Sequence, residues 1–293
     1  MGYQSLFNFF AFPVFNGSAF KSEKEKIKVM SWNVRLFDLY NWSNNNETKS
    51  KMFRFLEEEK PDIICFQEFF HQNRRNSLFV TRDSLFKILG AKYLHEEYTH
   101  KIIADQYFGS ATYSIYPIVN KGKIEFNDAP SNICLFSDIK IKEDTFRIYN
   151  LHLASIRLSN EDHHFLENIS DEDQQKKFKE GSGKIFSRMK RAFIVRSKQV
   201  KEIKRSMMSS PYPVMVMGDF NDTPTSFVYN NLKGDLVDAH KLHKYGVGGT
   251  YNGFANLFRI DYMLLHKKIK VEDFSVHQLP YSDHYALSAI ITR

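Results

Sequence analysis

Acidic, amide and imidazole side chains follow the apolar segments of this 293-residue chain at six places. In chain order, these side chains belong to Asn33, Glu68, His152, Asp219 with Asn221, Asp261, and Asp283 with His284. A single aspartate or asparagine after a strand is more often part of a turn or helix cap than a catalyst. Strand ends that converge on one rim, however, hold functional groups on rigid elements. We therefore interpret the six places as parts of one candidate site.

The side-chain types in this set predict a site for a hard cation. Carboxylate and amide oxygens suit Mg²⁺ and Mn²⁺, which keep several waters and use one or two protein carboxylates. Zinc fits less well, because the closely spaced pair His163 and His164 lies in a polar segment away from the set. The sequence therefore predicts a Mg²⁺ cofactor, with Mn²⁺ as the alternative.

Hydrolysis of a phosphate ester would use all of these groups. The metal neutralises a phosphoryl oxygen, an aspartate accepts a proton from the attacking water, and a protonated histidine stabilises the charge that develops. Asp261 and His284 can form the required aspartate–histidine pair if the last two strands are adjacent. The chain contains neither a GxxxxGK[ST] phosphate loop nor a GxSxG nucleophile motif.

Hydrophobic patterning places these groups on a framework of alternating strands and helices. Strands are expected at residues 27–32, 62–66, 93–98, 110–119, 132–141, 145–154, 213–221, 259–265 and 284–292. Helices are expected at residues 47–60, 76–89 and 191–208, and a polar helical insertion or lid at 156–190. Arg196 and Gln199, on the third helix, are expected to pack this helix against a sheet.

Composition excludes several classes of protein. With 42% hydrophobic and 26% charged residues, the chain is neither wholly disordered nor a coiled coil. Its two cysteines, Cys65 and Cys134, lie in apolar runs and are expected to be buried, inert thiols. The net charge of +7 favours a phosphate-bearing partner such as nucleic acid, anionic lipid or a phosphorylated metabolite.

The first twenty residues carry no charge, yet they include Asn8, Pro13 and Asn16. They fit neither a membrane-spanning helix nor a secretion signal. Residues 1–26 are expected to form an apolar N-terminal arm or the remnant of a membrane anchor, and residues 27–293 a single domain. The protein would be membrane-associated in the second case and otherwise cytoplasmic, and its oligomeric state stays open.

Six motifs occur in order along the chain: SWNVRLFD (31–38), DIICFQE (62–68), YNLHL (149–153), MGDFNDTP (217–224), RIDYML (259–264) and SDHYALSA (282–289). Together they resemble the endonuclease/exonuclease/phosphatase superfamily of deoxyribonuclease I-like enzymes, in particular a bacterial member. The resemblance implies a four-layer α/β/β/α sandwich of two mixed, mainly antiparallel sheets with outer helices. It also implies a site at one edge of the sandwich.

The resemblance assigns metal binding to three residues. It makes Glu68 the principal metal ligand, places Asn33 beside the metal, where it helps to hold Glu68, and adds Asp283 as a further acidic group.

Five residues receive catalytic roles from the same resemblance. His152 contacts the scissile phosphate, Asp219 activates the attacking water, and Asn221 orients both phosphate and water. Asp261 hydrogen-bonds His284, which stabilises the phosphoryl oxyanion or transfers a proton.

Four further residues are candidates for substrate binding. Arg35 occupies a position that is acidic in the abasic-site endonucleases, and it binds a phosphate or pairs with a nearby carboxylate. Arg157 follows the NLHL motif closely. Thr250 and Asn252 precede the RIDY motif in a loop that borders the site in the family.

The resulting functional hypothesis is a divalent-metal-dependent phosphoesterase. It would hydrolyse a phosphodiester, in nucleic acid or a phospholipid headgroup, by in-line attack of an activated water. The alternatives are a phosphomonoesterase for inositol phosphates or nucleotides, and a non-catalytic phosphate-binding or interaction protein on the same fold.

Overall fold

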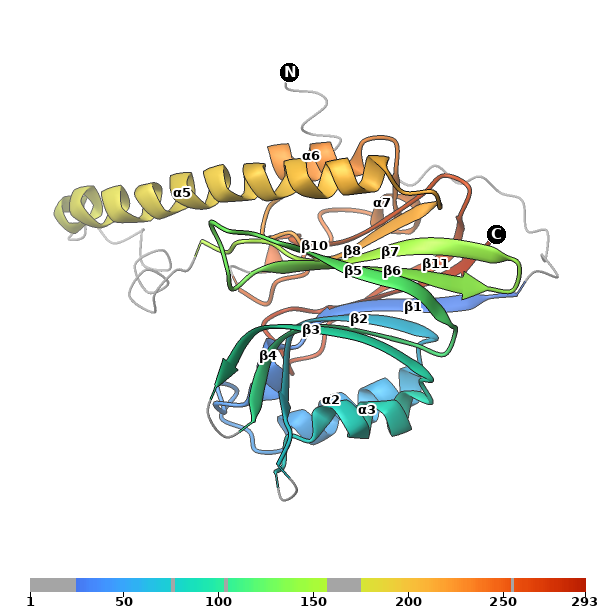
Figure 1. The fold of residues 1–293 in the computed structure, drawn as a ribbon. Coiled ribbons are helices and arrows are strands. Elements are labelled where there is room, and N and C mark those ends of the chain that lie inside the picture. The colour runs from blue at the N-terminus through green and yellow to red at the C-terminus, as the bar shows by residue number, and fades with distance from the viewer. Residues whose placement is uncertain (1–24, 75–76, 103–104, 157–174, 254–255) are drawn as a thin grey trace.

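Two six-stranded sheets lie face to face in this protein, and helices cover their outer faces (Figure 1). The computed structural model describes residues 25–74, 77–102, 105–156, 175–253 and 256–293. Within these residues the architecture is the four-layer sandwich that the motifs implied.

The first strand of the described chain lies near the centre of the first sheet. In spatial order this sheet consists of β11 (Lys270–His277), β12 (Ala286–Thr292), β1 (Ile27–Asn33), β2 (Ile63–Gln72), β4 (Gln106–Ser114) and β3 (Tyr93–Ile102). Only β1 and β2 run parallel to each other. Residues 63–66 of β2 are buried on both faces of the sheet, which explains their unbroken apolar sequence.

The second sheet has the same mixed character. In spatial order it consists of β5 (Ile118–Glu125), β6 (Ile133–Ile141), β7 (Asp144–His152), β8 (Val214–Asp219), β10 (Asp261–Leu265) and β9 (Val237–Asp238). The β6–β7 hairpin matches the prediction from the sequence. β7 and β8 are the parallel pair, and the other neighbours are antiparallel.

Helices complete the outer layers. α2 (Thr48–Glu59) and α3 (Thr81–Leu89) cover the first sheet, whereas α5 (Gln175–Met208) and α6 (Phe227–Lys233) cover the second (Figure 1). The short helix α7 (Ala239–His243) contacts β10 and β11. Met52 and Leu56 are the buried apolar face of α2, which ends at the left-handed residue Lys60 just before a proline.

The layer between the sheets is apolar over most of its area. Its core includes Val29, Ile63, Ile148 and Met217. Cys65 lies in the same core, and Cys134 is buried on the helix side of the second sheet, so both thiols are buried as expected. Burial raises the pKa of the Cys65 thiol to about 12, which keeps it protonated and inert.

One buried amide pair interrupts this apolar layer and ties the two sheets together. The Nε2 atom of Gln67 on β2 donates to Oδ1 of Asn150 on β7 at 2.8 Å. Asn150 in turn donates to the carbonyl oxygens of Phe66 and Ala111, at 3.2 and 3.0 Å. These bonds fix how the ends of β2 and β7 face each other.

Several expected elements differ from those observed. The stretch 110–119 is not one strand, because β4 ends at Ser114 and β5 begins at Ile118 in the other sheet. The second helix begins at Thr81 rather than at residue 76. The third extends back to Gln175, so the described part of the expected insertion, 175–190, belongs to α5. β11 was missed because a bulge between Val271 and Asp273 breaks its alternating pattern.

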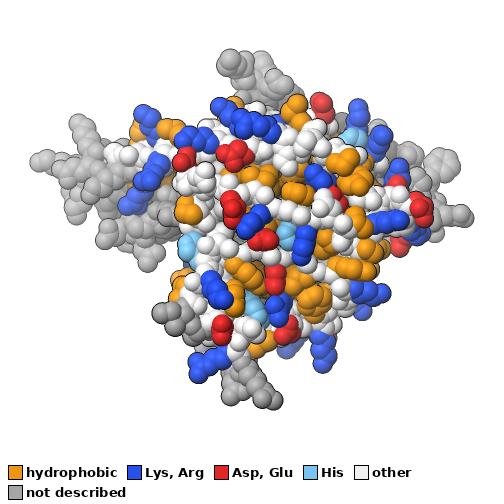
Figure 2. All heavy atoms as spheres, in the orientation of Figure 1, with side chains coloured by type: hydrophobic (Ala, Val, Ile, Leu, Met, Phe, Trp, Pro, Cys, Tyr) orange, Lys and Arg blue, Asp and Glu red, His pale blue; other side chains and the backbone are white. Residues whose placement is uncertain are grey.

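Lysine and arginine side chains are spread over the whole face shown in Figure 2, with acidic side chains among them. On this face the basic side chains are therefore interspersed with acidic ones. None of the described helices combines the length and apolar character needed to cross a membrane. Residues 1–24 of the expected arm or anchor lie outside the described residues, so membrane association stays a prediction.

Candidate active site

Three neighbouring strands of the second sheet bring their polar residues to one rim. His152 on β7 is the register partner of Asp219 on β8, and Asp219 is the register partner of Asp261 on β10. Residues directly opposite each other in a sheet have their side chains on the same face. Strand pairing alone therefore gathers these three groups.

The glycine directly before Asp219 allows β8 to lie very close to β7. Gly218 has φ of 138°, and a Cβ atom there would lie 2.1 Å from the carbonyl oxygen of Leu151. Only glycine fits this close approach of β7 and β8. After the strand, Asn221 takes a left-handed conformation (φ 52°). Its backbone N–H donates to Asp219 Oδ1 at 2.8 Å and its side-chain Nδ2 donates to Oδ2 at 3.0 Å, so Asn221 orients the Asp219 carboxylate.

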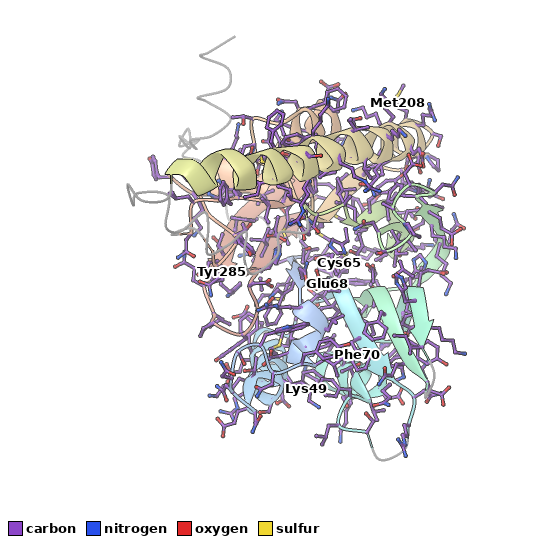
Figure 3. All side chains as sticks on the ribbon, turned by 90° about the vertical axis from the view of Figure 1, so that its left-hand side faces the viewer. Lys49, Cys65, Glu68, Phe70, Met208 and Tyr285 are labelled. Atoms are coloured by element: carbon purple, nitrogen blue, oxygen red, sulfur yellow. The ribbon has the colours of Figure 1, made fainter. Side chains whose placement is uncertain are left out.

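Glu68 reaches the same rim from the first sheet through a β-bulge. The register of β2 and β4 shifts between Phe66 and Phe69, and Glu68 itself has φ of 47°. A bulge re-aims a side chain that would otherwise follow the strand alternation. Gln67 thus remains buried between the sheets while Glu68 faces the rim, between the two halves of the molecule in Figure 3.

Asn33, at the end of β1, joins the two acidic groups. Its Nδ2 atom donates to Glu68 Oε1 at 3.2 Å and to Asp219 Oδ2 at 3.1 Å, and its Oδ1 atom accepts the N–H of Arg35. Because its amide is engaged with three protein groups, Asn33 positions Glu68. His152 Nε2 lies 3.7 Å from both Glu68 Oε1 and Asp219 Oδ2.

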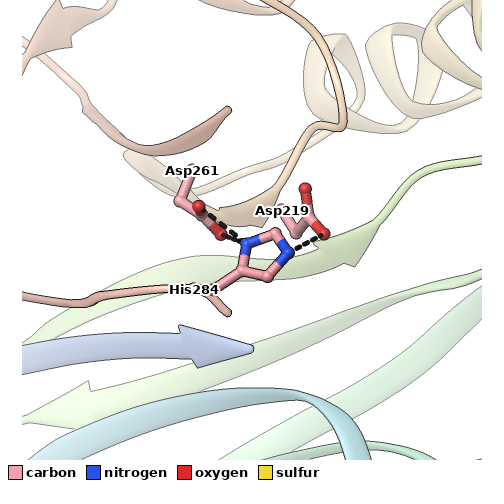
Figure 4. Close-up of side chains that lie close together, drawn as sticks. All are labelled: Asp219, Asp261 and His284. Atoms are coloured by element: carbon pink, nitrogen blue, oxygen red, sulfur yellow. Dashed lines mark hydrogen bonds and ion pairs between the residues drawn. The ribbon is translucent and has the colours of Figure 1, made fainter. Parts of the chain in front are cut away.

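His284 lies between two carboxylates (Figure 4). Its Nδ1 atom is 2.9 Å from Asp261 Oδ2, and its Nε2 atom is 3.7 Å from Asp219 Oδ2. The pair with Asp261 forms across the sandwich, because Asp261 belongs to the second sheet and His284 precedes β12 of the first. The expectation that the pair would come from adjacent strands was therefore wrong, although the pair itself is present.

The charged groups of this cluster shift one another's pKa values. Burial alone would lower the pKa of His284, but the carboxylates of Asp261 and Asp219 outweigh it and raise that pKa well above its ordinary value. Burial and the neighbouring Asp261 raise the pKa of Asp219 to about 6, against the opposing effects of His284 and His152. Burial lowers the pKa of His152, and the charge of His284 adds to this effect. The cluster therefore holds one cationic and one neutral imidazole around Asp219 at neutral pH.

The residues expected to bind substrate have other partners in the structure. Arg35 Nε lies 3.4 Å from Asp283 Oδ2, and its guanidinium carbon stands 4.6 Å from the centre of the Trp42 ring. The buried Thr250 hydroxyl accepts the backbone N–H groups of Ile260 and Asp261, each at 3.0 Å. Thr250 thus holds the start of β10 in place.

The remaining two substrate candidates are less informative. Asn252 donates its backbone N–H to the Asp283 carbonyl and accepts the Tyr285 hydroxyl with its side chain, at 2.7 and 2.8 Å. It therefore fixes the loop that carries Asp283. Arg157 lies outside the described residues. Substrate contact by these residues stays a prediction.

The structure offers two candidate positions for a metal ion: the cluster of Asp219, Asp261 and His284, and the rim at Glu68. Ligand atoms of Asp219, Asp261 and His284 lie within 4.8 Å of one another, but His284 Nδ1 is already hydrogen-bonded to Asp261. Glu68 is better suited, because its side chain is one-third exposed at the rim. Burial and the negative charge of Asp283 raise the Glu68 pKa, so a cation here would relieve an unfavourable charge. This donor set fits a hard cation held by Glu68.

Two residues of α5 pack against the segments that carry the candidate site, as expected for packing residues. Arg196 Nε donates to Asp222 Oδ2 at 3.0 Å and its Nη1 donates to the carbonyl of Ala154 at 2.8 Å. Gln199 Oε1 accepts the N–H of Ala154 at 3.0 Å. These bonds connect α5 to the segments that directly follow His152 and Asp219. The sequence placed Arg196 and Gln199 on this helix but gave no sign of their partners.

Replacing Gln199 with leucine is expected to destabilise the protein by about 1–3 kcal/mol, because the buried N–H of Ala154 loses its acceptor. Chemical denaturation measures this change. Glu202→Ala, an exposed position on the same helix, is the control and should change stability by less than about 0.5 kcal/mol. Equal stability of the two variants would show that Ala154 finds another partner.

The profile of the Endonuclease/Exonuclease/phosphatase family matches residues 30–284, which is most of the chain. The chain belongs to the endonuclease/exonuclease/phosphatase family. This match confirms the resemblance that the six motifs carried. None of the curated proteins compared with this family member matches it significantly.

Solved structures share the fold of this family member at low sequence identity. An endonuclease/exonuclease/phosphatase from Beutenbergia cavernae DSM 12333 is similar with a TM-score of 0.65 and 14% identity, over 92% of this chain and 72% of that one. The human nocturnin catalytic domain with bound sulfate gives 0.61 and 17%, over 91% and 94%. A mannosyl-6-phosphatase from Bacteroides thetaiotaomicron VPI-5482 gives 0.60 and 18%, over 91% and 100%. At these identities the likeness establishes the fold.

Proposed function

We propose that this protein is a divalent-metal-dependent phosphoesterase that hydrolyses a phosphodiester by in-line attack of an activated water. The observation that carries the proposal is the position of His284 between Asp261 and Asp219, next to Glu68 and His152. A cationic imidazole, a carboxylate with a raised pKa and a partly exposed glutamate on one rim are the groups that phosphate-ester hydrolysis needs.

Asp219 accepts the proton of the attacking water. Its pKa of about 6 is close to neutral pH, where a general base is most effective. Asn221 and Asn33 hold its two oxygens, so the carboxylate keeps one orientation. A base that is held in one orientation raises the reaction rate, because less entropy is lost when the reactive geometry forms.

His284 stabilises the charge that develops on the phosphoryl oxygens. Asp261 fixes the ring through Nδ1 and keeps it cationic, which leaves Nε2 directed toward Asp219 and the substrate. His152 is neutral and approaches from the opposite side of Asp219, where its Nε2 can contact the scissile phosphate. A preformed arrangement of this kind avoids reorganisation during the reaction.

Glu68 would hold the metal, with Asp283 as the neighbouring acidic group. A bound Mg²⁺ or Mn²⁺ supplies Lewis-acid stabilisation of a phosphoryl oxygen and of the leaving group. Nucleic acid and phospholipid headgroups are the proposed diester carriers. One protein of similar structure, TDP2 from D. rerio, was solved in complex with a single-stranded DNA product, which supports the nucleic-acid choice.

The purified protein should hydrolyse bis(p-nitrophenyl) phosphate with Mg²⁺ or Mn²⁺ and lose this turnover in EDTA. Release of p-nitrophenol measures the rate. If no diester or monoester is turned over with either metal, and His284→Ala binds phosphate ligands as well as the wild type does, the protein is a binding member of its family and the proposal fails.

Glu68→Gln is expected to weaken Mn²⁺ binding by more than about 100-fold, since even outer partners of metal ligands contribute 10–100-fold in affinity. Titration calorimetry with Mn²⁺ measures this loss without reference to turnover. Glu58→Gln, an exposed glutamate of α2, is the matched control and should bind as the wild type does. Unchanged Mn²⁺ affinity in Glu68→Gln would move the metal to other residues.

A further inference from the structure

A cleft of about 240 Å³ opens directly beside Glu68 and His152. Pockets for drug-sized ligands measure about 300–1,000 Å³. The cleft is therefore large enough for one ring-sized group attached to the phosphate, and too small for a duplex or a pair of acyl chains.

Two polar side chains of this cleft hydrogen-bond to no other described residue. Ser110 is 1% exposed and Asn132 is 7% exposed, and neither belongs to the sealed, unpaired polar groups of the described residues, so their polar atoms are accessible from the cleft. A ligand group that reproduces the hydrogen bonds of solvent at such a position can replace it. An amide and a hydroxyl each offer both a donor and an acceptor. Their natural partners are the hydroxyl groups of a ligand.

Apolar side chains also line the cleft. Phe108, two residues before Ser110 on β4, and Leu36 are both partly buried members of the lining. Leu36 belongs to a turn in which all four residues, Arg35–Asp38, have positive φ angles between 43° and 57°. Left-handed conformations cost non-glycine residues about 1–2 kcal/mol each, and such strain persists mainly at functional sites.

The strained turn is held by its third residue. Phe37 is fully buried, and its ring packs edge-on against Phe53 and Phe69 at centroid distances of 5.7 and 5.6 Å. Leu36 directly precedes this anchored residue and lines the cleft.

The charged residues that line the cleft indicate what kind of ligand it binds. Among the described residues that line the cleft, Glu68 is the single carboxylate and none is a lysine or arginine. A second phosphate would normally be bound by such cations. The described lining therefore favours a group that is polar but uncharged.

We propose that this cleft binds an uncharged, hydroxyl-rich sugar ring of the substrate, packed on Phe108 and hydrogen-bonded to Asn132 and Ser110. The inference rests on the proposed phosphoesterase function and names its substrate class. The sugar of a hexose phosphate and the ribose of a nucleotide share this chemistry.

Competition against the turnover of bis(p-nitrophenyl) phosphate tests the proposal. Glucose 6-phosphate and ribose 5-phosphate represent the two sources of the sugar, phenyl phosphate is an ester without hydroxyl groups, and fructose 1,6-bisphosphate carries a second phosphate. At least one sugar monophosphate should inhibit about tenfold more strongly than phenyl phosphate and the bisphosphate, which corresponds to one net hydrogen bond. The sugar monophosphate that inhibits more strongly shows whether the bound sugar is a hexose or a ribose.

Variants of the cleft locate the binding. Asn132→Ala and Ser110→Ala should each weaken inhibition by the preferred sugar phosphate about tenfold and change inhibition by phenyl phosphate less than about twofold. Ser110→Ala removes only a hydroxyl that bonds to no described residue, so its fold is unaffected. Asn127→Ala, an exposed asparagine in the preceding turn, is the control and should behave as the wild type.

Tighter binding of phenyl phosphate or the bisphosphate, or indifference of both cleft variants, would overturn the proposal. If bis(p-nitrophenyl) phosphate is not turned over, inhibition has no readout, and calorimetry with the same four compounds decides the cleft separately from the phosphoesterase function. Sugar-phosphate binding that Asn132→Ala abolishes supports the sugar site. Absence of sugar-phosphate binding in the wild type, or binding that Asn132→Ala leaves unchanged, rejects it.

Discussion

Replacing Asp219 with asparagine is expected to lower kcat by about 10²–10⁴-fold, the range for loss of a positioned acid–base group. The amide keeps the shape of the carboxylate but cannot accept the proton of the attacking water. The carbonyl oxygen of the amide can replace Oδ2 and accept from the side-chain Nδ2 atoms of Asn33 and Asn221, but its NH2 group then faces the backbone N–H of Asn221. The variant should therefore lose turnover at a modest cost in stability, because one of the three hydrogen bonds is lost.

Steady-state hydrolysis of bis(p-nitrophenyl) phosphate, together with thermal melting, checks this expectation. Asp235→Asn, an exposed aspartate after α6, is the matched control and should retain full kcat. If Asp219→Asn keeps more than about a tenth of the wild-type kcat, another group activates the water. Because Glu68 and His152 are the nearest other candidates, they would be the next residues to replace.

A second large effect is expected on stability, from the buried ion pair of Arg259 and Asp238. Arg259 Nη1 lies 2.8 Å from Asp238 Oδ2, and Tyr229 donates its hydroxyl to the same oxygen at 2.7 Å. Both charged side chains are almost completely buried. Asp238→Asn leaves the guanidinium without its counter-charge and should cost about 3–5 kcal/mol. Urea denaturation at neutral pH measures this change.

The pH dependence of this difference follows from the Asp238 pKa. Burial would raise it, but the charge of Arg259 and the hydrogen bond from Tyr229 outweigh burial and lower it. A carboxylate with a lowered pKa stabilises the fold above the pKa of about 3.9 in the unfolded chain and loses this effect as pH falls through its folded pKa. The stability difference between the wild type and Asp238→Asn should therefore begin to shrink as pH falls below about 4 and disappear only below the folded pKa of Asp238, which is lower.

Two comparisons complete this test. Asp273→Asn, an exposed aspartate of β11, should change stability by less than about 0.5 kcal/mol. Adding Arg259→Met to Asp238→Asn should restore much of the loss, because no unpaired charge remains and the asparagine keeps an acceptor oxygen for Tyr229. A loss below about 1 kcal/mol in Asp238→Asn alone would show that water reaches Arg259.

Two strand ends of the site could be predicted because local sequence determines them. β1 ends at Asn33 and β8 at Asp219 as expected, whereas Glu68 lies inside β2 at its bulge, so the expected strand end at Glu68 was wrong although all three residues lie at one rim. The family motifs supplied the architecture, which hydrophobic patterning alone did not. The six short motifs indicated the family because they occur together and in order along the chain.

Other features depend on contacts that sequence patterns do not record. The left-handed turn at Arg35–Asp38 contains no glycine, so nothing in its sequence indicates positive φ angles; Phe37 holds it through residues far along the chain. Asn132 and Ser110 belong to no motif, and only the packing of the two sheets places them in a common cleft. Gln67 and Asn150 lie within motifs, but their pairing needs both sheets.

The pairing of β1 with β12 has a consequence for synthesis. Ile27 on the first described strand is the register partner of Ile291 on the last, and Trp32 Nε1 donates to the carbonyl oxygen of His284. A ribosome that adds about 5–20 residues per second exposes one edge of β1 until β12 has emerged. The nascent protein thus carries an open, apolar strand edge that invites aggregation. His284 directly precedes the strand that closes this edge, so the candidate site gains its histidine as the first sheet is completed.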